Sequence, residues 1–277
     1  MPELPEVETV RRGLNQLTLN QEITGGDVLL PRIIAHPFFV EEFIENIKTS
    51  AITSWHRRGK YLLAELSPSS WLGVHLRMTG QLLWLNRNEP LHKHTRVRLF
   101  FGDQQELRFV DQRTFGQMWY VPGNVPVESI ITGLAKLAVD PFSPEFTVEY
   151  LANKLQKVRR PIKTALLDQS IVAGLGNIYA DEALFKSGIL PTTICTELQK
   201  KQIEPLRTAI IDVLSASIAA GGTTFSNFLN VKGVNGNYGG EAWVYNRAGE
   251  PCKVCSNTIQ RIKLGGRSSH FCSQCQS

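Results

Sequence analysis

Four cysteines near the C-terminal end constrain the fold of this chain more than any other feature of its sequence. Cys252, Cys255, Cys272 and Cys275 form a C-x2-C-x16-C-x2-C pattern, and the fifth cysteine, Cys195, lies far from them. Each C-x2-C pair can hold one edge of a tetrahedral metal site, and four thiolates complete the coordination of Zn²⁺. The N-terminus lacks the basic and apolar parts of a secretory signal, so a disulfide framework is not expected. The pattern therefore predicts one structural zinc ion in a small C-terminal module.

The module predicted around the cysteines, residues 251–277, has basic side chains and no acidic ones. It contains no acidic residue and four basic ones, Lys253, Arg261, Lys263 and Arg267. Four thiolates and one Zn²⁺ offset only part of this charge, so the module stays positive. The segment between the cysteine pairs predicts a β-hairpin that turns at Gly265-Gly266. A positive hairpin suits contacts with phosphate, and a solvated basic face is the alternative.

The rest of the sequence changes from β-type to helical patterns along its length. Val7, Val10, Leu14 and Leu17 recur at helical spacing and predict a first helix. From about residue 27 to 121, short runs rich in β-formers alternate with turn residues, as in an antiparallel sandwich or barrel. The expected strands are 61–66, 71–76, 81–85, 96–101, 106–110 and 117–121.

A proline-rich stretch, from Pro122 to Pro144, separates this β-rich part from a helical one. Helical periodicity recurs near 147–157, 162–170, 177–187 and 196–220. Residues 221–250 are rich in Gly and Asn, and loops of this length usually serve a function or are disordered.

Composition narrows the possible partners. The 277 residues suit two domains, and no apolar run approaches the roughly 18 residues of a membrane span, so no membrane partner is expected. A net charge of +5 permits a polyanionic partner. One basic cluster contains Lys154, Lys157, Arg159, Arg160 and Lys163 without an acidic residue between them. A glycine turn then leads into a helix at Asn177, which can cap that helix or contact DNA.

The N-terminal residues supply a candidate nucleophile. Removal of Met1 would leave Pro2 as a free secondary amine, and an α-amino group has a pKa near 8, well below that of lysine. A neutral amine can attack a sugar carbon and form an iminium, and Glu3 and Glu6 lie close enough in sequence to move protons. A simple helix entry is the alternative interpretation of the same residues.

The chain as a whole resembles the bacterial formamidopyrimidine-DNA glycosylases. The resemblance covers nearly all of the sequence and rests on several motifs in the same order. These are PELPEVETVRRGL at 2–14, RRGKYLL at 57–63, HLRMTG at 75–80, DQRTFG at 111–116, GLGNIYADE at 174–182, VYNRAGEPCKVC at 244–255 and GGRSSHFCSQCQ at 265–276.

The resemblance implies a fold and a reaction. The fold is α+β: an N-terminal β-sandwich with a leading catalytic helix, a helix-two-turn-helix domain and a β-hairpin zinc finger. The reaction is excision of oxidised purines from duplex DNA, followed by cleavage of the strand. Pro2 would be the Schiff-base nucleophile, Glu3 the general acid/base with support from Glu6, Lys60 the partner for β-elimination, and Arg267 the residue for δ-elimination.

The resemblance also implies the residues that bind DNA. The damaged nucleotide must leave the base stack, because the enzyme cannot reach it there. Met78, Arg113 and Phe115 would fill the gap, with Arg113 facing the unpaired cytosine. Residues that would contact phosphates or position the strand are His75, His94, Arg160, Lys163 and Asn177. Residues 221–242 would close over the displaced base.

Predicted domain boundaries follow from these patterns. We expect a catalytic domain at 1–130, a linker at 131–146, a helix-two-turn-helix domain at 147–250 and a zinc finger at 251–277. The protein is expected to act as a monomer in the bacterial cytosol and nucleoid.

Two departures from the family pattern leave alternatives open. Thr114 occupies a position where a second basic residue is common, and the loop at 231–245 differs from its usual form. An endonuclease VIII-like enzyme for oxidised pyrimidines is one alternative, although Leu4 favours the purine branch. A non-catalytic DNA-binding zinc protein is the other.

Overall fold

A computed structural model describes residues 1–223 and 229–277. The chain divides into two compact units, which are described separately. Unit 1 comprises Met1–Ala135 with Ala220–Asn237, and unit 2 comprises Lys136–Ala219 with Tyr238–Ser277. The predicted loop at 221–242 thus falls partly in each unit, and its residues 224–228 lie outside the described part of the chain. The domain boundaries expected from the sequence stay predictions.

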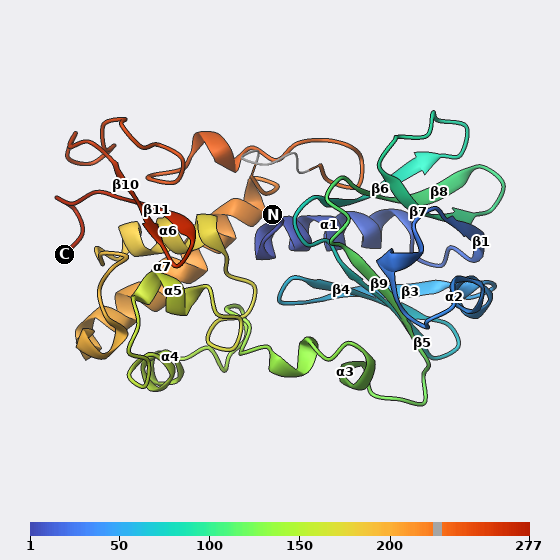
Figure 1. The fold of residues 1–277 in the computed structure, drawn as a ribbon, viewed down its shortest axis with the longest axis horizontal. Helices are drawn as coiled ribbons and strands as arrows, with labels where there is room; N and C mark the ends of the chain where they lie inside the picture. The colour runs from blue at the N-terminus through green and yellow to red at the C-terminus, as the bar shows by residue number, and fades with distance from the viewer. Residues whose placement is uncertain (224–228) are drawn as a thin grey trace. The chain divides into compact units, whose positions relative to one another are not determined.

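Unit 1 is built from two β-sheets and a long first helix (Figure 1). The first sheet has the strand order β1-β7-β8-β6, and the second has the order β2-β9-β5-β4-β3. All the strand pairs are antiparallel except β2 with β9. The elements are α1 (Leu4–Leu17), β1 (Ile23–Val28), η1 (Pro31–Ile33), β2 (Ile34–His36), α2 (Val40–Ile47), β3 (Ile52–Arg58), β4 (Tyr61–Leu66), β5 (Ser70–His75), β6 (Gly80–Asn86), β7 (Thr95–Phe101), β8 (Gln105–Asp111), β9 (Gln117–Val121) and α3 (Val127–Ile130).

One apolar core joins the two sheets and helix α1. Trp55 and Leu62 reach it from the second sheet, Leu99 from the first, and Val7 and Leu14 from α1. Burial of such side chains is the main favourable term in folding, at roughly 25 cal/mol per Å² of apolar surface. The helix is therefore fixed along its length, and its first turn has a defined position within unit 1.

Unit 2 combines a group of helices with a two-stranded hairpin. Helix α6 packs against α5, α7 and strand β11, and α4 packs against α7. The elements are α4 (Val148–Leu155), α5 (Ile162–Leu166), α6 (Asn177–Lys186), η3 (Cys195–Glu197), α7 (Lys200–Ala219), η4 (Tyr238–Gly240), β10 (Gln260–Leu264) and β11 (Arg267–Phe271), with η2 (Leu134–Lys136) at the boundary between the units. In the turn of the hairpin, Gly265 and Gly266 have φ angles of 55° and 79°, which glycine adopts without strain.

The structure confirms the α+β class, the N-terminal β-sandwich, the helical region and the C-terminal hairpin. Strands β4 and β9 coincide with the predicted ranges 61–66 and 117–121. Helix α2 and strand β3 were not predicted, although Val40, Phe43, Ile44 and Ile47 of α2 recur at helical spacing. Among the described helices, none is long and apolar enough to cross a membrane.

Candidate functional site

The first turn of α1 holds two carboxylates in a reciprocal arrangement. Glu3 caps the helix, and its side chain accepts from the backbone N–H of Glu6. The Glu6 carboxylate accepts from the N–H of Glu3 at 2.8 Å and from the N–H of Thr223 at 3.0 Å. Both carboxylates are buried, with exposed fractions of 2% and 0%. Such a capping box satisfies the free N–H groups of the turn and fixes both side chains next to Pro2.

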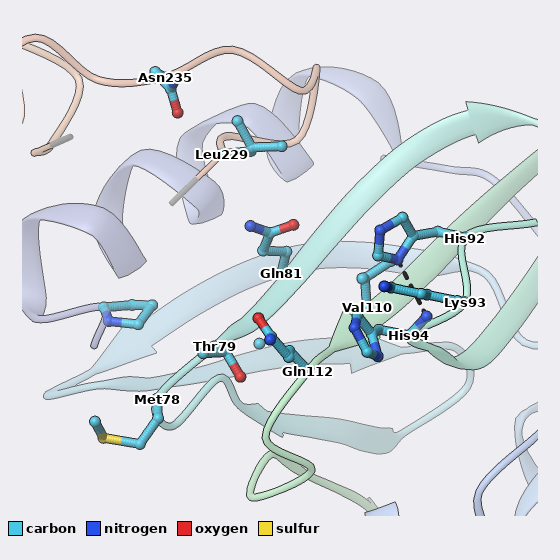
Figure 2. A pocket seen from close by; sticks show the side chains of 12 residues that line it. Met78, Thr79, Gln81, His92, Lys93, His94, Val110, Gln112, Leu229 and Asn235 are labelled. Carbon is cyan, nitrogen blue, oxygen red and sulfur yellow. Dashed lines mark hydrogen bonds between the residues drawn. The ribbon is translucent and has the colours of Figure 1, made fainter. Parts of the chain in front are cut away.

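A pocket of about 710 Å³ opens beside Pro2 in unit 1. This volume lies in the range of small-molecule sites, roughly 300–1,000 Å³. Figure 2 shows Gln81 and Gln112 between Met78 on one side and the His92–His94 segment on the other. The lining residues are Pro2, Met78, Thr79, Gly80, Gln81, His92, Lys93, His94, Val110, Gln112, Leu229 and Asn235.

Lys60 lies in the two-residue turn between β3 and β4. The strands pair up to Arg58 and Tyr61, and Gly59 has a φ of 55°, so the turn is tight. The Lys60 side chain is buried, with 7% exposed. Arg57 holds the turn from one side, because it donates to the Gly59 carbonyl at 3.1 Å and to the Glu8 carboxylate at 3.2 Å.

The charges around the N-terminus act on its amino group. Burial lowers the pKa of the Met1 amine, Glu3 and Glu6 oppose this change, and Lys60 and Arg113 reinforce it. A lowered pKa increases the neutral fraction of an amine near pH 7. The surroundings of this terminus therefore favour a nucleophilic amine.

His75, at the end of β5, is neutral near pH 7. Burial lowers the pKa of this imidazole to about 3, and Arg77 and Lys60 act in the same direction. The backbone N–H of Arg77 donates to His75 Nδ1 at 3.0 Å, so the ring proton is on Nε2. His75 is thus a neutral hydrogen-bond donor, and its ring stands at 83° to that of Tyr61.

Met78, Arg113 and Phe115 lie on two neighbouring turns of unit 1. Met78 is half-buried and Arg113 is exposed. Phe115 is 53% exposed, so its ring is accessible from solvent. The Arg113 guanidinium lies 4.9 Å from the centre of the Phe115 ring. The two turns are connected, because the N–H of Arg113 donates to Thr79 Oγ1 at 2.9 Å.

His94 lines the pocket and is oriented by Arg96. The Arg96 guanidinium contacts His94 Nδ1 at 3.1 Å. A guanidinium can only donate, so Nδ1 accepts and the ring proton of neutral His94 lies on Nε2. His92 shares the pocket, and its ring centre is 5.4 Å from that of His94.

In unit 2, Lys163 is buried and Asn177 is half-buried. Lys163 is fully buried, pairs with Asp181 and donates to the Asn177 carbonyl at 3.0 Å. Asn177 is the first residue of α6, and Gly176 is the N-cap residue, so Asn177 does not cap the helix. Its buried Oδ1 has no hydrogen-bond partner among the described residues. Arg160 is exposed and donates to Asp168 at 2.5 Å.

The four cysteines form one cluster, as their spacing predicted. Their Sγ atoms all lie within 4.8 Å of one another, with Cys252 and Cys275 3.9 Å apart and Cys255 and Cys272 3.4 Å apart. Zn–S bonds of about 2.3 Å in a tetrahedron place sulfurs about 3.8 Å apart. The N–H of Val254 also points at Cys252 Sγ, at 3.4 Å. The donor set and its spacing fit a structural zinc ion.

The hairpin that carries Arg267 is attached to α6. Arg267 begins β11 directly after the glycine turn and is exposed. Further along the strand, the N–H of His270 donates to Asp181 at 3.0 Å, and His270 Nδ1 contacts the same oxygen at 3.1 Å. Since Lys163 also pairs with Asp181, this carboxylate connects α5, α6 and β11.

Sequence reasoning missed several residues of the site. Asp111, Asp181 and Thr223 make its buried hydrogen bonds, and His92 and Gln81 line its pocket. Asp111 and Asp181 belong to the DQRTFG and GLGNIYADE motifs. The sequence of a motif does not show which hydrogen bonds a single carboxylate in it makes. The roles of these two residues became clear only from their hydrogen-bond partners, which are distant in sequence.

Comparison with known families supports the sequence resemblance. The formamidopyrimidine-DNA glycosylase N-terminal domain matches residues 1–118, the H2TH domain of the same enzyme matches 137–228, and the zinc finger found in FPG and IleRS matches 249–277. Formamidopyrimidine-DNA glycosylase of Trichormus variabilis is 81% identical and that of Trichodesmium erythraeum 62% identical, each over 100% of both chains.

Solved structures agree with these relatives. A Lactococcus lactis FPG mutant in complex with DNA containing Fapy-dG is 34% identical, with a TM-score of 0.91 over 100% of both chains. The Lactococcus lactis Fpg bound to DNA with an abasic site has the same identity and TM-score over 99% of both chains. This chain belongs to the formamidopyrimidine-DNA glycosylase family.

Proposed function

We propose that this protein is a DNA glycosylase of base excision repair that removes oxidised purines, 8-oxoguanine and formamidopyrimidines, from duplex DNA. It then cleaves the strand at the resulting abasic site by β,δ-elimination. One observation carries this proposal: Pro2, Glu3 and Lys60 are all buried around the start of α1, where Pro2 lines the pocket. The complexes of Lactococcus lactis Fpg with Fapy-dG and abasic-site DNA support the same substrates.

The proposed chemistry begins at the nitrogen of Pro2 once Met1 has been removed. The amine attacks the anomeric carbon of the damaged nucleotide, and the bond from that carbon to the base breaks. The base leaves with the electron pair and takes up a proton. Opening of the sugar ring gives an iminium, with a proton passing to the ring oxygen. Glu3, held by the capping box, is the group that moves these protons, and Glu6 keeps it in place.

Strand cleavage follows from the charge of the iminium. This charge acidifies the adjacent sugar carbon, and loss of its proton expels one flanking phosphate. A second elimination expels the other phosphate. Lys60 is the residue proposed to assist the first step, and its burial within electrostatic reach of the N-terminal amine supports this role. Arg267, exposed at the tip of the hairpin, is the residue proposed for the second step.

We propose that one zinc ion, held by the four cysteines, stabilises the hairpin that carries Arg267. A structural zinc contributes folding free energy and has no open position for substrate. Arg113, Phe115 and Met78 would fill the gap in the duplex, and basic side chains would hold the phosphates. Because all these proposed groups lie on one chain, a monomer is sufficient for the proposed reaction. The proposed DNA substrate implies that the enzyme acts in the bacterial cytosol and nucleoid.

Borohydride trapping tests the proposed nucleophile. Reduction of the iminium should link the protein irreversibly to DNA that carries 8-oxoguanine opposite cytosine. The matched control is a variant with an uncleavable N-terminal extension, in which the Pro2 nitrogen is an amide and the DNA-binding residues are unchanged. We expect it to bind DNA without trapping or cleavage. Efficient trapping by this variant would identify another amine, above all Lys60, as the nucleophile.

A lesion panel separates the proposed function from its alternatives. We expect faster excision of 8-oxoguanine opposite cytosine than of thymine glycol opposite adenine. The reverse order would favour the pyrimidine-lesion enzyme, an alternative supported by a Lactococcus lactis Fpg complex with oxidised-pyrimidine DNA. Binding of both duplexes without incision would indicate the non-catalytic DNA-binding protein.

A further inference from the structure

Asp111, the last residue of β8, makes hydrogen bonds within unit 1 with both carboxylate oxygens, its backbone N–H and its carbonyl. Its side chain is fully buried. Oδ1 accepts from the Thr79 hydroxyl at 2.5 Å, and Oδ2 accepts from the N–H of Gly116 at 2.8 Å. Its own N–H donates to the His94 carbonyl at 2.9 Å, and its carbonyl accepts from Arg96 Nε at 2.8 Å. Three separate segments of the chain, at Thr79, His94–Arg96 and Gly116, thus meet at one residue.

The contacts of Asp111 lead to the Met78 and Arg113–Phe115 turns and to His94, which are proposed DNA-contact residues of unit 1. Thr79 follows Met78, and its hydroxyl also accepts from the N–H of Arg113 at 2.9 Å. Gly116 follows Phe115 and closes the turn. Arg96 in turn contacts the ring of His94.

The turn that carries Arg113 and Phe115 needs such an anchor. Thr114 has a φ of 57°, a conformation that a β-branched residue rarely adopts. At Gly116 a Cβ atom would lie 2.4 Å from the Phe109 ring, so the turn passes close over the core. An exposed, strained turn persists only where its surroundings determine it, and here the bonds to Asp111 and Thr79 do so.

We propose that Asp111 is a positioning residue, which acts through Thr79 to hold the Met78 and Arg113–Phe115 turns in the one arrangement that reads the base opposite the lesion. This inference rests on the proposed function. An ionised carboxylate only accepts hydrogen bonds, so it suits a site that receives donors at both oxygens. An asparagine would direct its NH2 group at one of those donors.

Thr79 offers a matched pair of variants. Thr79→Val keeps the shape but removes the hydroxyl that joins Asp111 to Arg113, whereas Thr79→Ser keeps the hydroxyl. The first readout is amide hydrogen exchange at Arg113. We expect it to accelerate in Thr79→Val and to stay at the wild-type rate in Thr79→Ser. Asp111→Asn should accelerate exchange at Gly116 as well.

The functional readout compares two substrates. On duplex DNA, excision of 8-oxoguanine opposite cytosine is compared with excision opposite adenine. On single-stranded DNA with an abasic site there is no opposite base to read. We expect Thr79→Val to lower the cytosine-to-adenine ratio about tenfold, which matches the loss of one base contact. Cleavage of the single strand should fall by a smaller factor than the cytosine-to-adenine ratio does, because it involves no opposite base.

Three results would overturn the inference. The first is a Thr79→Val variant that keeps the wild-type ratio of excision opposite cytosine to excision opposite adenine. The second is an equal loss of activity on duplex and single-stranded DNA, which indicates general damage to the fold. The third is a Thr79→Ser variant as impaired as Thr79→Val. Failure of the proposed function is distinguishable, because the wild-type protein would then not excise 8-oxoguanine opposite cytosine, and this inference would fall with it.

Discussion

The ammonium group of Lys163 pairs with the carboxylate of Asp181 in the interior of unit 2, where both side chains are fully buried. The sequence analysis placed Lys163 among the phosphate contacts, together with its basic neighbours. In the structure Lys163 pairs with Asp181, and the same carboxylate accepts from the N–H and ring of His270 in β11. A direct phosphate contact would require Lys163 to leave this pair, and that role stays a prediction.

Replacing Lys163 should therefore affect stability more than DNA affinity. In Lys163→Met the Asp181 carboxylate stays buried without its cationic partner, which costs about 3–5 kcal/mol when a buried pair is broken. Chemical unfolding measures this loss. The slope of log K against log salt should match that of the wild type, because no phosphate contact is removed.

The control for this prediction is Lys157→Ala. Lys157 belongs to the same basic cluster but is exposed. It should keep wild-type stability, and if it contacts a phosphate the salt slope should become shallower by about 0.9. A stable Lys163→Met variant with a reduced slope would show that Lys163 leaves Asp181 to bind DNA.

The cysteine cluster predicts one tightly held zinc ion per chain. Four cysteine sulfurs within 4.8 Å of one another match the ligand set of a tetrahedral zinc site. Metal analysis of purified protein should give one zinc, and Cys272→Ser should lose both zinc and strand cleavage. Cys195→Ala is the control, since Cys195 is buried elsewhere in unit 2. Active protein without zinc would contradict the prediction.

Local sequence patterns predicted the elements of the fold better than they predicted the contacts of the site. The strand at 61–66 and the glycine turn of the hairpin follow from periodicity and turn chemistry, which act over a few residues. Thr223 lies 217 residues from its partner Glu6, and Asp111 lies 32 residues from Thr79. No local pattern encodes such pairs, because tertiary packing brings them together.

The sequence also does not show which basic residues are buried and which are exposed. In the sequence, Lys163 and Lys157 look alike, as two lysines of one cluster. The structure buries the first and exposes the second, because Ile162 and Ala165 beside Lys163 belong to the buried face of α5. The position of a charge relative to the core, rather than its presence, separates a structural role from a binding one.

Arg32 is predicted to supply the cation that Thr114 does not. In the family that this chain resembles, a basic residue is common at position 114. In the structure the guanidinium of Arg32, in η1, contacts the Thr114 hydroxyl, and Arg32 is exposed. Arg32→Ala should make the salt slope of DNA binding shallower by about 0.9, the value for one phosphate.

A second substitution tests whether a guanidinium at the Thr114 turn is enough to restore the salt dependence of DNA binding. Thr114→Arg in the Arg32→Ala background should restore the slope, because it returns a guanidinium to the same turn. It adds no backbone strain, since the φ of 57° is already borne by a β-branched residue. Lys48→Ala, which removes an exposed lysine after α2, should leave the slope unchanged. An unchanged slope in Arg32→Ala would refute the contact.

The carboxylate of Glu8 should stabilise the turn of Lys60 in a pH-dependent way. Burial raises the pKa of Glu8, but hydrogen bonds from Arg11 and Arg12 outweigh it, and with the charge of Arg57 the pKa falls to about 2. A carboxylate with a lowered pKa in the folded state adds stability above its ordinary pKa. That stability is lost as the pH falls through the folded value.

Glu8→Gln measures this contribution. Near pH 7 the variant should be less stable than the wild type by about 1–3 kcal/mol, as expected for hydrogen bonds to charged groups. The difference should shrink below about pH 5 and nearly vanish towards pH 2, because the wild-type carboxylate is then protonated as well. Glu128→Gln, at an exposed glutamate of α3, should show no comparable difference. If the stability gap between Glu8→Gln and the wild type stayed constant from pH 7 to pH 3, the charge of Glu8 would not hold Arg57 and the Lys60 turn in place.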